Sequence, residues 1–298
     1  MPSGRPTVSF ELYPPRTPAT AAAAWETVQR LAAAGPDFFS VTYGASGSSR
    51  TASRDVVRRI LRETTVPPIA HLTCVGATRA ELADLVGQLV DDGVRDFLAL
   101  RGDPPAGETR WQPQPGGLAG SSELVELIRD VERERLGTDG AVSIAVAAYP
   151  AGTSHTRAQD VRALLDKQAA GADFAVTQVF YDVEPYVSLV EEARSAGVVL
   201  PVVAGIIPMT DPGRLARLAQ LTGVEVPQRV VDLLAVEDDE HRHRLGIDAT
   251  VELVEAAIAA GAPGIHLYTF NQFRPALDVV ERLRRPLPTI APTHARTL

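Results

Sequence analysis

Short apolar runs alternate along this chain with longer stretches in which apolar positions recur at helical spacing. Runs of about four to eight apolar residues predict buried strands, and the longer amphipathic stretches predict helices. Eight such runs are present, and a helical stretch follows each of them. The predicted strands are Val8–Phe10, Phe38–Tyr43, Ile69–Cys74, Asp96–Leu100, Ser143–Ala148, Phe174–Val179, Leu200–Ile207 and Gly264–Tyr268.

The alternation of strands and helices predicts the fold. The predicted helices are Ala21–Ala34, Arg54–Glu63, Arg79–Asp92, Ser122–Arg135, Ala158–Ala170, Pro185–Ala196, a longer helical region Pro212–Ala260, and Pro275–Leu283. Glycines that would form left-handed caps follow five of them, at Gly35, Gly93, Gly171, Gly197 and Gly261. Eight strand–helix units describe an α/β fold, the (β/α)₈ TIM barrel. A doubly wound open sheet is the alternative, but no glycine-rich dinucleotide fingerprint follows a strand.

This pattern fits one catalytic domain, which we place at residues 1–285. Residues 286–298 are rich in proline and poor in apolar side chains, so we expect a surface tail there and no C-terminal regulatory domain. A segment rich in proline and glycine, Pro104–Gly120, forms a long loop after the fourth strand. Long loops in compact domains are usually functional.

Composition narrows the class of protein. The net charge of −8 and the absence of a basic stripe argue against a nucleic-acid partner. A single cysteine, Cys74, excludes an intrachain disulfide and suits a reducing compartment. No signal peptide precedes the first strand, and no apolar run reaches the roughly 18 residues that a membrane span requires. We therefore expect a soluble, cytoplasmic protein without a membrane partner. The sequence leaves open whether it forms a homo-oligomer.

Polar residues gather at the carboxyl ends of the predicted strands, where barrels of this type place their active sites. Glu11 is the most informative, because a carboxylate at the end of a buried strand is costly unless it has a partner or a task. The paired prolines Pro14 and Pro15 prevent the strand from continuing. The other strand ends supply Thr42, Tyr43, Gly44, His71, Arg101, Gly102, Asp103, Tyr149, Gln178, Pro208, Tyr268 and Asn271.

Several of these residues have a structural alternative. Glu11 could pair with Arg16 or Arg101 at the rim, and Arg101 could pair with Asp103 across a glycine turn. His71 fits a hydrogen-bonded core histidine, and Cys74 fits simple packing. His241 and His243 lie among acidic residues at a solvated helix start, with spacing that suits a metal poorly. Lys167 falls inside a helix, which argues against a Schiff-base enzyme.

Glu11 and Asp103 at a mouth lined by an amide and aromatic rings suit an acid-assisted reaction on a flat heterocycle. Two other classes stay open at this point. A barrel lyase or hydrolase would use Glu11 and Asp103 as an acid/base pair and need no nicotinamide. A non-catalytic binding barrel would keep its function when Glu11 is replaced by glutamine.

At these positions the chain resembles the methylenetetrahydrofolate reductases, from Ser9 to about Leu283. Each motif is weak alone, but their order along the chain is specific. They are Phe10-Glu11-Leu12-Tyr13-Pro14-Pro15-Arg16, Ser40-Val41-Thr42-Tyr43-Gly44-Ala45, His71-Leu72-Thr73-Cys74, Leu100-Arg101-Gly102-Asp103, Ala147-Ala148-Tyr149-Pro150, Thr177-Gln178-Val179-Phe180-Tyr181-Asp182 and His266-Leu267-Tyr268-Thr269-Phe270-Asn271.

The resemblance implies a (β/α)₈ flavoprotein of one-carbon metabolism and methionine biosynthesis. Such an enzyme passes a hydride from NADH or NADPH through FAD to 5,10-methylenetetrahydrofolate, and forms 5-methyltetrahydrofolate. It implies Glu11 as the general acid, with Asp103 placing the pterin and stabilising its cation. Gln178, Tyr268 and Gln272 would also contact folate, and Thr42 and Gln178 would contact the nicotinamide. The FAD contacts would be Tyr43, Ala45, His71, Arg101, Gly102, Asp103, Tyr149, His155, Asp160 and Lys167.

Departures from the family pattern concern mainly the flavin. The segment from Pro150 to Asp160 is about two residues shorter than in the family, so His155 is displaced relative to the family's histidine. Gly120 replaces an aromatic residue, while Ala163 and Asp166 replace an amide and a cation. Gln272 replaces an arginine that contacts folate, with Arg274 as a nearby substitute. An acidic residue facing a diphosphate repels it, so hydride transfer without flavin is a second form of the same hypothesis.

Overall fold

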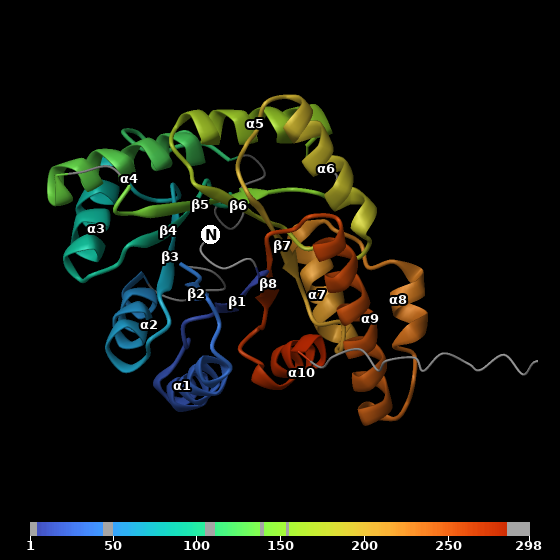
Figure 1. The fold of residues 1–298 in the computed structure, drawn as a ribbon. Helices are drawn as coiled ribbons and strands as arrows, with labels where there is room; N and C mark the ends of the chain where they lie inside the picture. Colours follow the sequence, from blue (N-terminus) through green and yellow to red (C-terminus); the bar gives the residue numbers. More distant parts are fainter. Residues whose placement is uncertain (1–4, 44–49, 105–110, 138–139, 153–154, 285–298) are drawn as a thin grey trace, which may run out of the picture.

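The computed structural model describes residues 5–43, 50–104, 111–137, 140–152 and 155–284 of the 298-residue chain. Parallel strands close a barrel in which each pairs with its neighbours in chain order and the last pairs with the first (Figure 1). This confirms the predicted (β/α)₈ barrel. The strands are β1 (Thr7–Leu12), β2 (Phe38–Val41), β3 (Pro68–Thr73), β4 (Asp96–Leu100), β5 (Ser143–Ala148), β6 (Phe174–Thr177), β7 (Val202–Ile206) and β8 (Gly264–Tyr268).

Helices surround the barrel and cover the outer face of its strands (Figure 1). Three successive helices connect β7 to β8, where the sequence predicts one long helical region. One break runs from Gly223, which ends α7 in a left-handed conformation, to Pro227, which precedes α8, and a second runs from Leu234 at the end of α8 to Asp238, which caps α9. The helices are α1 (Pro18–Ala33), α2 (Arg50–Glu63), α3 (Arg79–Asp91), α4 (Ser121–Leu136), α5 (Arg157–Ala169), α6 (Val183–Ser195), α7 (Pro212–Thr222), α8 (Gln228–Leu233), α9 (Asp239–Ala259) and α10 (Phe273–Arg284).

Local sequence signals explain most element boundaries. The five predicted cap glycines have φ between 64° and 101°, as left-handed caps require. The prediction for β1 is wrong at its end, because the strand continues to Leu12 and Glu11 lies within it. Glu11 pairs in register with Ser40 of β2 and Tyr268 of β8, so its backbone is part of the sheet. The predicted tail, 286–298, lies outside the described residues.

The two faces of the strands differ in character. On β1, Phe10 and Leu12 belong to the main apolar core, which is shared with the helices. Ser9 and Glu11 alternate with them and so face the barrel interior. A smaller cluster, formed by Ile69, Leu98 and Ala145 with partly buried Phe38, Leu100 and Phe174, is separate from the main core.

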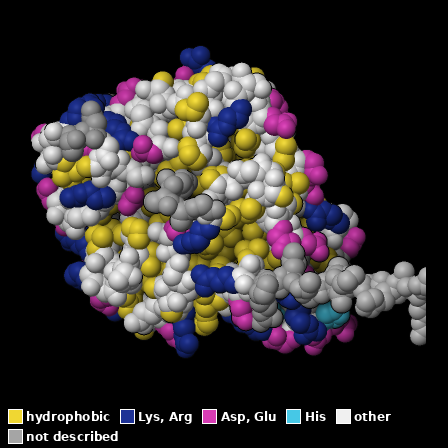
Figure 2. Space-filling view, viewed as in Figure 1, with side chains coloured by type: hydrophobic (Ala, Val, Ile, Leu, Met, Phe, Trp, Pro, Cys, Tyr) yellow, Lys and Arg dark blue, Asp and Glu magenta, His cyan; other side chains and the backbone are white. Residues whose placement is uncertain are grey.

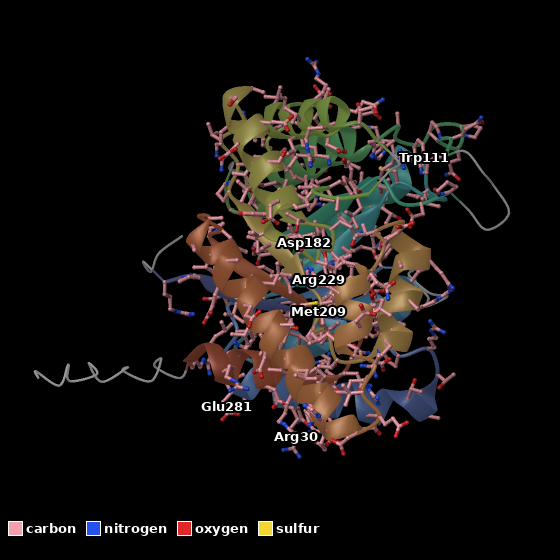
Figure 3. The ribbon with its side chains drawn as sticks, turned by 90° about the vertical axis from the view of Figure 1, so that its right-hand side faces the viewer. Arg30, Trp111, Asp182, Met209, Arg229 and Glu281 are labelled. Atoms are coloured by element: carbon pink, nitrogen blue, oxygen red, sulfur yellow. The ribbon has the colours of Figure 1, made fainter. Side chains whose placement is uncertain are left out.

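The inserted helices also reach the loop after β6. Arg229 of α8 donates hydrogen bonds to the Tyr181 carbonyl oxygen and to the Asp182 carboxylate, and the labelled side chains of Arg229 and Asp182 lie side by side in Figure 3. This contact fastens the loop that follows Gln178.

The surface carries a mixture of charge and apolar area. Hydrophobic side chains gather near the middle of the face in Figure 2, and acidic and basic side chains lie mostly around them. None of the helices in the described ranges combines the length and apolar character needed to cross a bilayer.

Candidate active site

The buried carboxyl group of Glu11 is the centre of the candidate site. Its residue is only 7% exposed, and its side chain shares a hydrogen bond with Tyr13. Neither Arg16 nor Arg101 forms the predicted ion pair with it among the described residues. Burial raises the pKa of Glu11 to about 7, although the hydrogen bond from Tyr13 opposes this rise. A carboxyl group with this pKa is protonated in a large fraction of molecules at neutral pH, as a general acid must be.

The backbone around Glu11 is tied to the end of β8. Thr269 donates from its hydroxyl to the Glu11 carbonyl oxygen at 2.6 Å. One residue before Thr269, the phenol of Tyr268 donates to the Thr177 carbonyl oxygen at 2.6 Å. Gly205 leaves room for this ring, since a Cβ there would lie 2.7 Å from the Tyr268 hydroxyl oxygen and 2.1 Å from the Thr177 oxygen. The predicted substrate contact Tyr268 therefore lies at the mouth, with its hydroxyl directed to the backbone.

A layer of hydrogen-bonded polar groups inside the barrel was missed from the sequence. The Ser9 hydroxyl donates to the Ile265 carbonyl oxygen at 3.0 Å and lies 2.8 Å from Nδ1 of His266. Nε2 of His266 lies 3.0 Å from the Ser40 hydroxyl. Because the Ser9 proton is already used, Nδ1 carries the imidazole proton and Ser40 donates to Nε2. The sequence did contain a signal for this layer, because Ser9, Ser40 and His266 alternate with apolar neighbours on their strands.

The two buried histidines are both neutral. Burial lowers the pKa of His71 and of His266 to about 3, and each pKa is therefore far below neutrality. The Nε2 atom of His71 is buried without a hydrogen-bond partner in the described part of the chain, and so is the Thr42 hydroxyl. A buried polar atom without a hydrogen-bond partner destabilises the folded protein. These two atoms therefore suit a bound molecule that supplies their partners.

A second group of predicted residues meets between β5 and α5. Thr156 caps α5 in a reciprocal pair with Gln159, which fixes the start of the helix. Lys167, about three turns along, is buried and donates from Nζ to the Ala147 carbonyl oxygen at 2.7 Å. Although Lys167 lies inside a helix, its side chain therefore reaches the end of β5, which the sequence-based argument did not foresee.

The other members of this group contact one another. Nδ1 of His155 lies 3.5 Å from the Asp160 carboxylate, and its ring meets the Tyr149 ring edge-on at 5.9 Å. The shortened loop therefore still brings His155 to Tyr149 and Asp160. Burial lowers the pKa of Lys167 to about 8, and the charge of Asp160 opposes this decrease.

The residues after β4 are more exposed than expected for a catalytic pair. Asp103 and Arg101 are both exposed, and the predicted Arg101–Asp103 ion pair is absent among the described residues. Instead, the Arg101 guanidinium lies 5.5 Å from the centre of the Trp111 ring. Asp103 therefore has the solvent access of a binding residue, whereas Glu11 is buried.

The remaining predicted contacts occupy different environments. The side-chain oxygen of Gln178 accepts a hydrogen bond from the Val179 backbone N–H at 2.9 Å, which fixes the direction of this oxygen. Gln272 is exposed. Arg274 does not stand free beside Gln272, because it makes a two-bond ion pair with Glu240 at 2.9 and 2.6 Å. Ala45 and Gly44 lie outside the described residues. Cys74 is buried, and its pKa is raised to about 12 by burial, as a packing residue requires.

A groove of about 630 Å³ leads outward from Tyr13 and Phe270, whose rings lie 5.5 Å apart. Arg16 and Arg217 line it, and no acidic side chain of the described residues pairs with either. Although the protein has a net charge of −8, guanidinium groups without an acidic partner attract anions locally. The groove is formed by Tyr13, Pro14, Pro15, Arg16, Thr20, Ala23, Ala24, Glu26, Thr27, Arg217, Leu221, Phe270, Asn271, Gln272, Phe273 and Arg274.

Within the described ranges, no cluster of three or more His, Cys, Asp or Glu side chains could hold an ion. His243 is half-buried and lies 2.6 Å from the Asp278 carboxylate, so it is less solvated than predicted, while His241 is exposed.

Comparison with known proteins places these features in a family. The family profile described as methylenetetrahydrofolate reductase matches residues 1–284. The 5,10-methylenetetrahydrofolate reductase of Escherichia coli is 32% identical over 275 residues, which cover 90% of this chain and 88% of that protein. A probable methylenetetrahydrofolate reductase (NADH) of rice is 30% identical over 98% of this chain.

Coverage and fold comparison complete this finding. The chain spans about half the length of the rice and maize relatives, at 52% and 51%. A solved structure from Clostridium thermocellum superposes with a TM-score of 0.65 at 15% identity, and covers 93% of this chain and 95% of its own. That protein is described as binding two copies of 5-methyl-5,6,7,8-tetrahydrofolic acid. At this identity the likeness supports the barrel fold alone.

Proposed function

This chain belongs to the methylenetetrahydrofolate reductase family, and from that premise we propose that it reduces 5,10-methylenetetrahydrofolate to 5-methyltetrahydrofolate with NADH or NADPH. The observation that carries the proposal is the buried, uncompensated carboxyl of Glu11, whose pKa is raised to about 7 at the mouth of the barrel. The reaction needs a proton donor that works at neutral pH. Glu11 has the protonation state and the position for that task.

The chemistry divides into a proton transfer and a hydride transfer. Glu11 donates its proton to the nitrogen that leaves the methylene carbon, so that the carbon–nitrogen bond breaks and a 5-iminium cation forms. A hydride then adds to the methylene carbon and converts it to a methyl group, while the nicotinamide is oxidised. Asp103, an anion at the mouth, stabilises the cation, and Gln178 orients the ring systems.

Thr42 and His71 are the groups that would meet the hydride source. Their buried Oγ1 and Nε2 atoms have no partner among the described residues and can hydrogen bond to a planar ring system. These atoms fit a flavin ring, with Tyr149, Asp160 and Lys167 alongside it. When bound there, FAD would accept the nicotinamide hydride and deliver it to folate.

One observation favours the form of the reaction without flavin. Asp166 of α5, which replaces a cation of the family, is exposed and forms an ion pair with Arg162 at 3.0 Å. Its carboxylate would oppose a diphosphate placed beside this position, where the family has a cation. In this form the nicotinamide itself occupies the site at Thr42 and Gln178 and donates its hydride directly.

The groove beside Glu11 supports folate as the substrate. A folate presents a flat pterin, an aromatic aminobenzoyl ring and terminal carboxylates in sequence. With the pterin at Glu11, the aminobenzoyl ring would lie along Tyr13 and Phe270, and the carboxylates would reach Arg16 and Arg217. The groove therefore offers both the aromatic rings and the guanidinium groups that this substrate requires.

The proposal is tested by turnover with an identified product. The purified protein is incubated with 5,10-methylenetetrahydrofolate and NADH or NADPH, with and without added FAD, and 5-methyltetrahydrofolate is measured by chromatography. Its absorbance spectrum before and after addition of FAD reports flavin binding. Product formation supports the proposed activity, and failure to form product with either nucleotide, with or without FAD, contradicts it. Full turnover by a colourless sample that FAD does not stimulate would exclude the flavin form.

A further inference from the structure

The phenol of Tyr13 lies against the Glu11 carboxyl in the barrel mouth. The two side chains share a hydrogen bond, and the structure gives Glu11 no cationic partner among the described residues. A buried carboxylate without a cation depends on hydrogen-bond donors for its stability. Tyr13 is therefore the group that determines how Glu11 is held.

An unusual backbone arrangement fixes Tyr13 in place. The side-chain oxygen of Asn271 accepts from the Tyr13 backbone N–H at 2.8 Å, and its side-chain nitrogen donates to the Tyr13 carbonyl oxygen at 2.8 Å. Asn271 and the preceding Phe270 have φ of 54° and 49°, in the left-handed region that non-glycine residues rarely adopt. Such conformations persist where the surrounding structure enforces them, and they cluster at functional sites.

The same loop holds both members of the pair. Thr269 binds the Glu11 carbonyl oxygen, Asn271 binds the Tyr13 backbone on both sides, and the Phe270 ring packs against the Tyr13 ring at 5.5 Å. Asn271 therefore fixes the backbone of Tyr13, and the contact with the Phe270 ring restrains the orientation of its side chain. The left-handed conformation of Phe270 and Asn271 is explained if the β8–α10 loop keeps the Tyr13 phenol against the Glu11 carboxyl.

We propose that Tyr13 is a positioning residue for the proton donor, whose phenolic O–H donates to the Glu11 carboxylate and holds it toward the substrate. This inference rests on the proposed function, because it assigns Tyr13 a role in the reaction that Glu11 performs. No other described residue has a side-chain hydrogen bond to Glu11 that affects its titration.

The surrounding charges are consistent with this role. Burial and the Glu11 charge raise the pKa of Tyr13 far above its ordinary value, so the phenol keeps its proton and remains a donor. Tyr268 also faces Tyr13 and Glu11, but its proton is directed to the Thr177 carbonyl oxygen. Tyr149 raises the pKa of Tyr268 but is not among the groups that shift the pKa of Glu11. The Glu11 carboxyl is therefore influenced by burial, which raises its pKa, and by Tyr13, which lowers it.

The test is the Tyr13→Phe variant, which retains the ring, its contact with Phe270 and the backbone bonds to Asn271. Without the phenol the Glu11 carboxylate loses its donor, so the pKa of Glu11 rises by about one unit. The alkaline limb of the kcat/KM profile for folate reduction should move to higher pH by that amount. On the plateau below this limb, kcat should fall by about threefold to thirtyfold, because the acid is held less firmly.

Tyr186→Phe is the matched control, since it removes a phenolic hydrogen bond to the Val202 carbonyl oxygen at 2.8 Å elsewhere in the fold. It should leave the pH profile unchanged. Infrared difference spectroscopy of the protonated carboxyl, identified by its loss in Glu11→Gln, measures the same titration without turnover. An unchanged Glu11 titration and pH profile in Tyr13→Phe would overturn the inference. Absence of folate reduction by the wild-type protein would contradict the proposed function and the role of Tyr13 with it.

Discussion

Glu11 shows how one residue can carry the chemistry of a barrel. Its place near the paired prolines made it a candidate from sequence, and the structure adds the reason for its acidity. It faces the interior on β1, at 7% exposure, and none of the cationic side chains that the structure describes pairs with it. Sequence alone could not supply the Tyr13 hydrogen bond or the Asn271 clamp, because both depend on a loop more than 250 residues away in the chain.

The burial of Glu11 predicts a pH-dependent stability. Its pKa is about 7 in the folded protein and near 4.5 in an unfolded chain, so the folded state binds this proton more tightly. The stabilising contribution is complete below pH 4.5 and is lost as pH rises through 7. Glu11→Gln should therefore raise the free energy of unfolding at pH 8, by up to about 3 kcal/mol, and by far less at pH 5.

Urea unfolding at the two pH values measures this difference. The control is Glu134→Gln on α4, because Glu134 is exposed and its replacement should change stability by less than about 0.5 kcal/mol at either pH. A Glu11→Gln effect of equal size at pH 5 and pH 8 would show that the carboxyl does not titrate in this range.

At the scale of elements, contacts between strand ends and helices form the site. Lys167 of α5 reaches β5, Arg229 of α8 fastens the loop after Gln178, and Gly205 of β7 makes room for Tyr268. Helical periodicity predicted α5 but could not show that Lys167 turns inward. It also merged α7, α8 and α9 into one region, because it recognised neither the break from Gly223 to Pro227 between α7 and α8 nor the break from Leu234 to Asp238 before α9.

The groove between α1, α7 and the start of α10 predicts a specific effect on substrate affinity. Arg217→Gln should raise KM for the folate by about twofold to fivefold, because an exposed guanidinium contributes modestly to binding a carboxylate. Its kcat and the KM for the nicotinamide should stay unchanged. The effect should shrink at high salt, where exposed charges are screened.

Arg62→Gln on α2 is the control for this experiment. Arg62 is also exposed and has no acidic partner among the described residues, but it does not line the groove. Steady-state kinetics in low and high salt compare the two variants. Equal folate KM values for Arg217→Gln and the wild type would remove Arg217 from the substrate site.

At the scale of the whole molecule, the barrel was predictable because its eight-fold alternation is repeated along the entire chain. Membership in the family follows from motifs at successive strand ends and from the match over residues 1–284. Side-chain partners were less predictable. The sequence offered an Arg101–Asp103 ion pair as one alternative, yet the Arg101 guanidinium lies over the Trp111 ring and Asp103 is exposed. It also offered Arg274 as a substitute for a folate-binding arginine, whereas Arg274 binds Glu240.

The most direct test of the account is the rate of folate reduction by Glu11→Gln and wild-type protein between pH 5.5 and 9. For the wild type, we predict a rate that declines above about pH 7, as the acid loses its proton. For Glu11→Gln, we predict a kcat lower by about 10²- to 10⁴-fold, with nicotinamide binding retained. Near-normal turnover by Glu11→Gln would contradict the assignment of Glu11 as the proton donor.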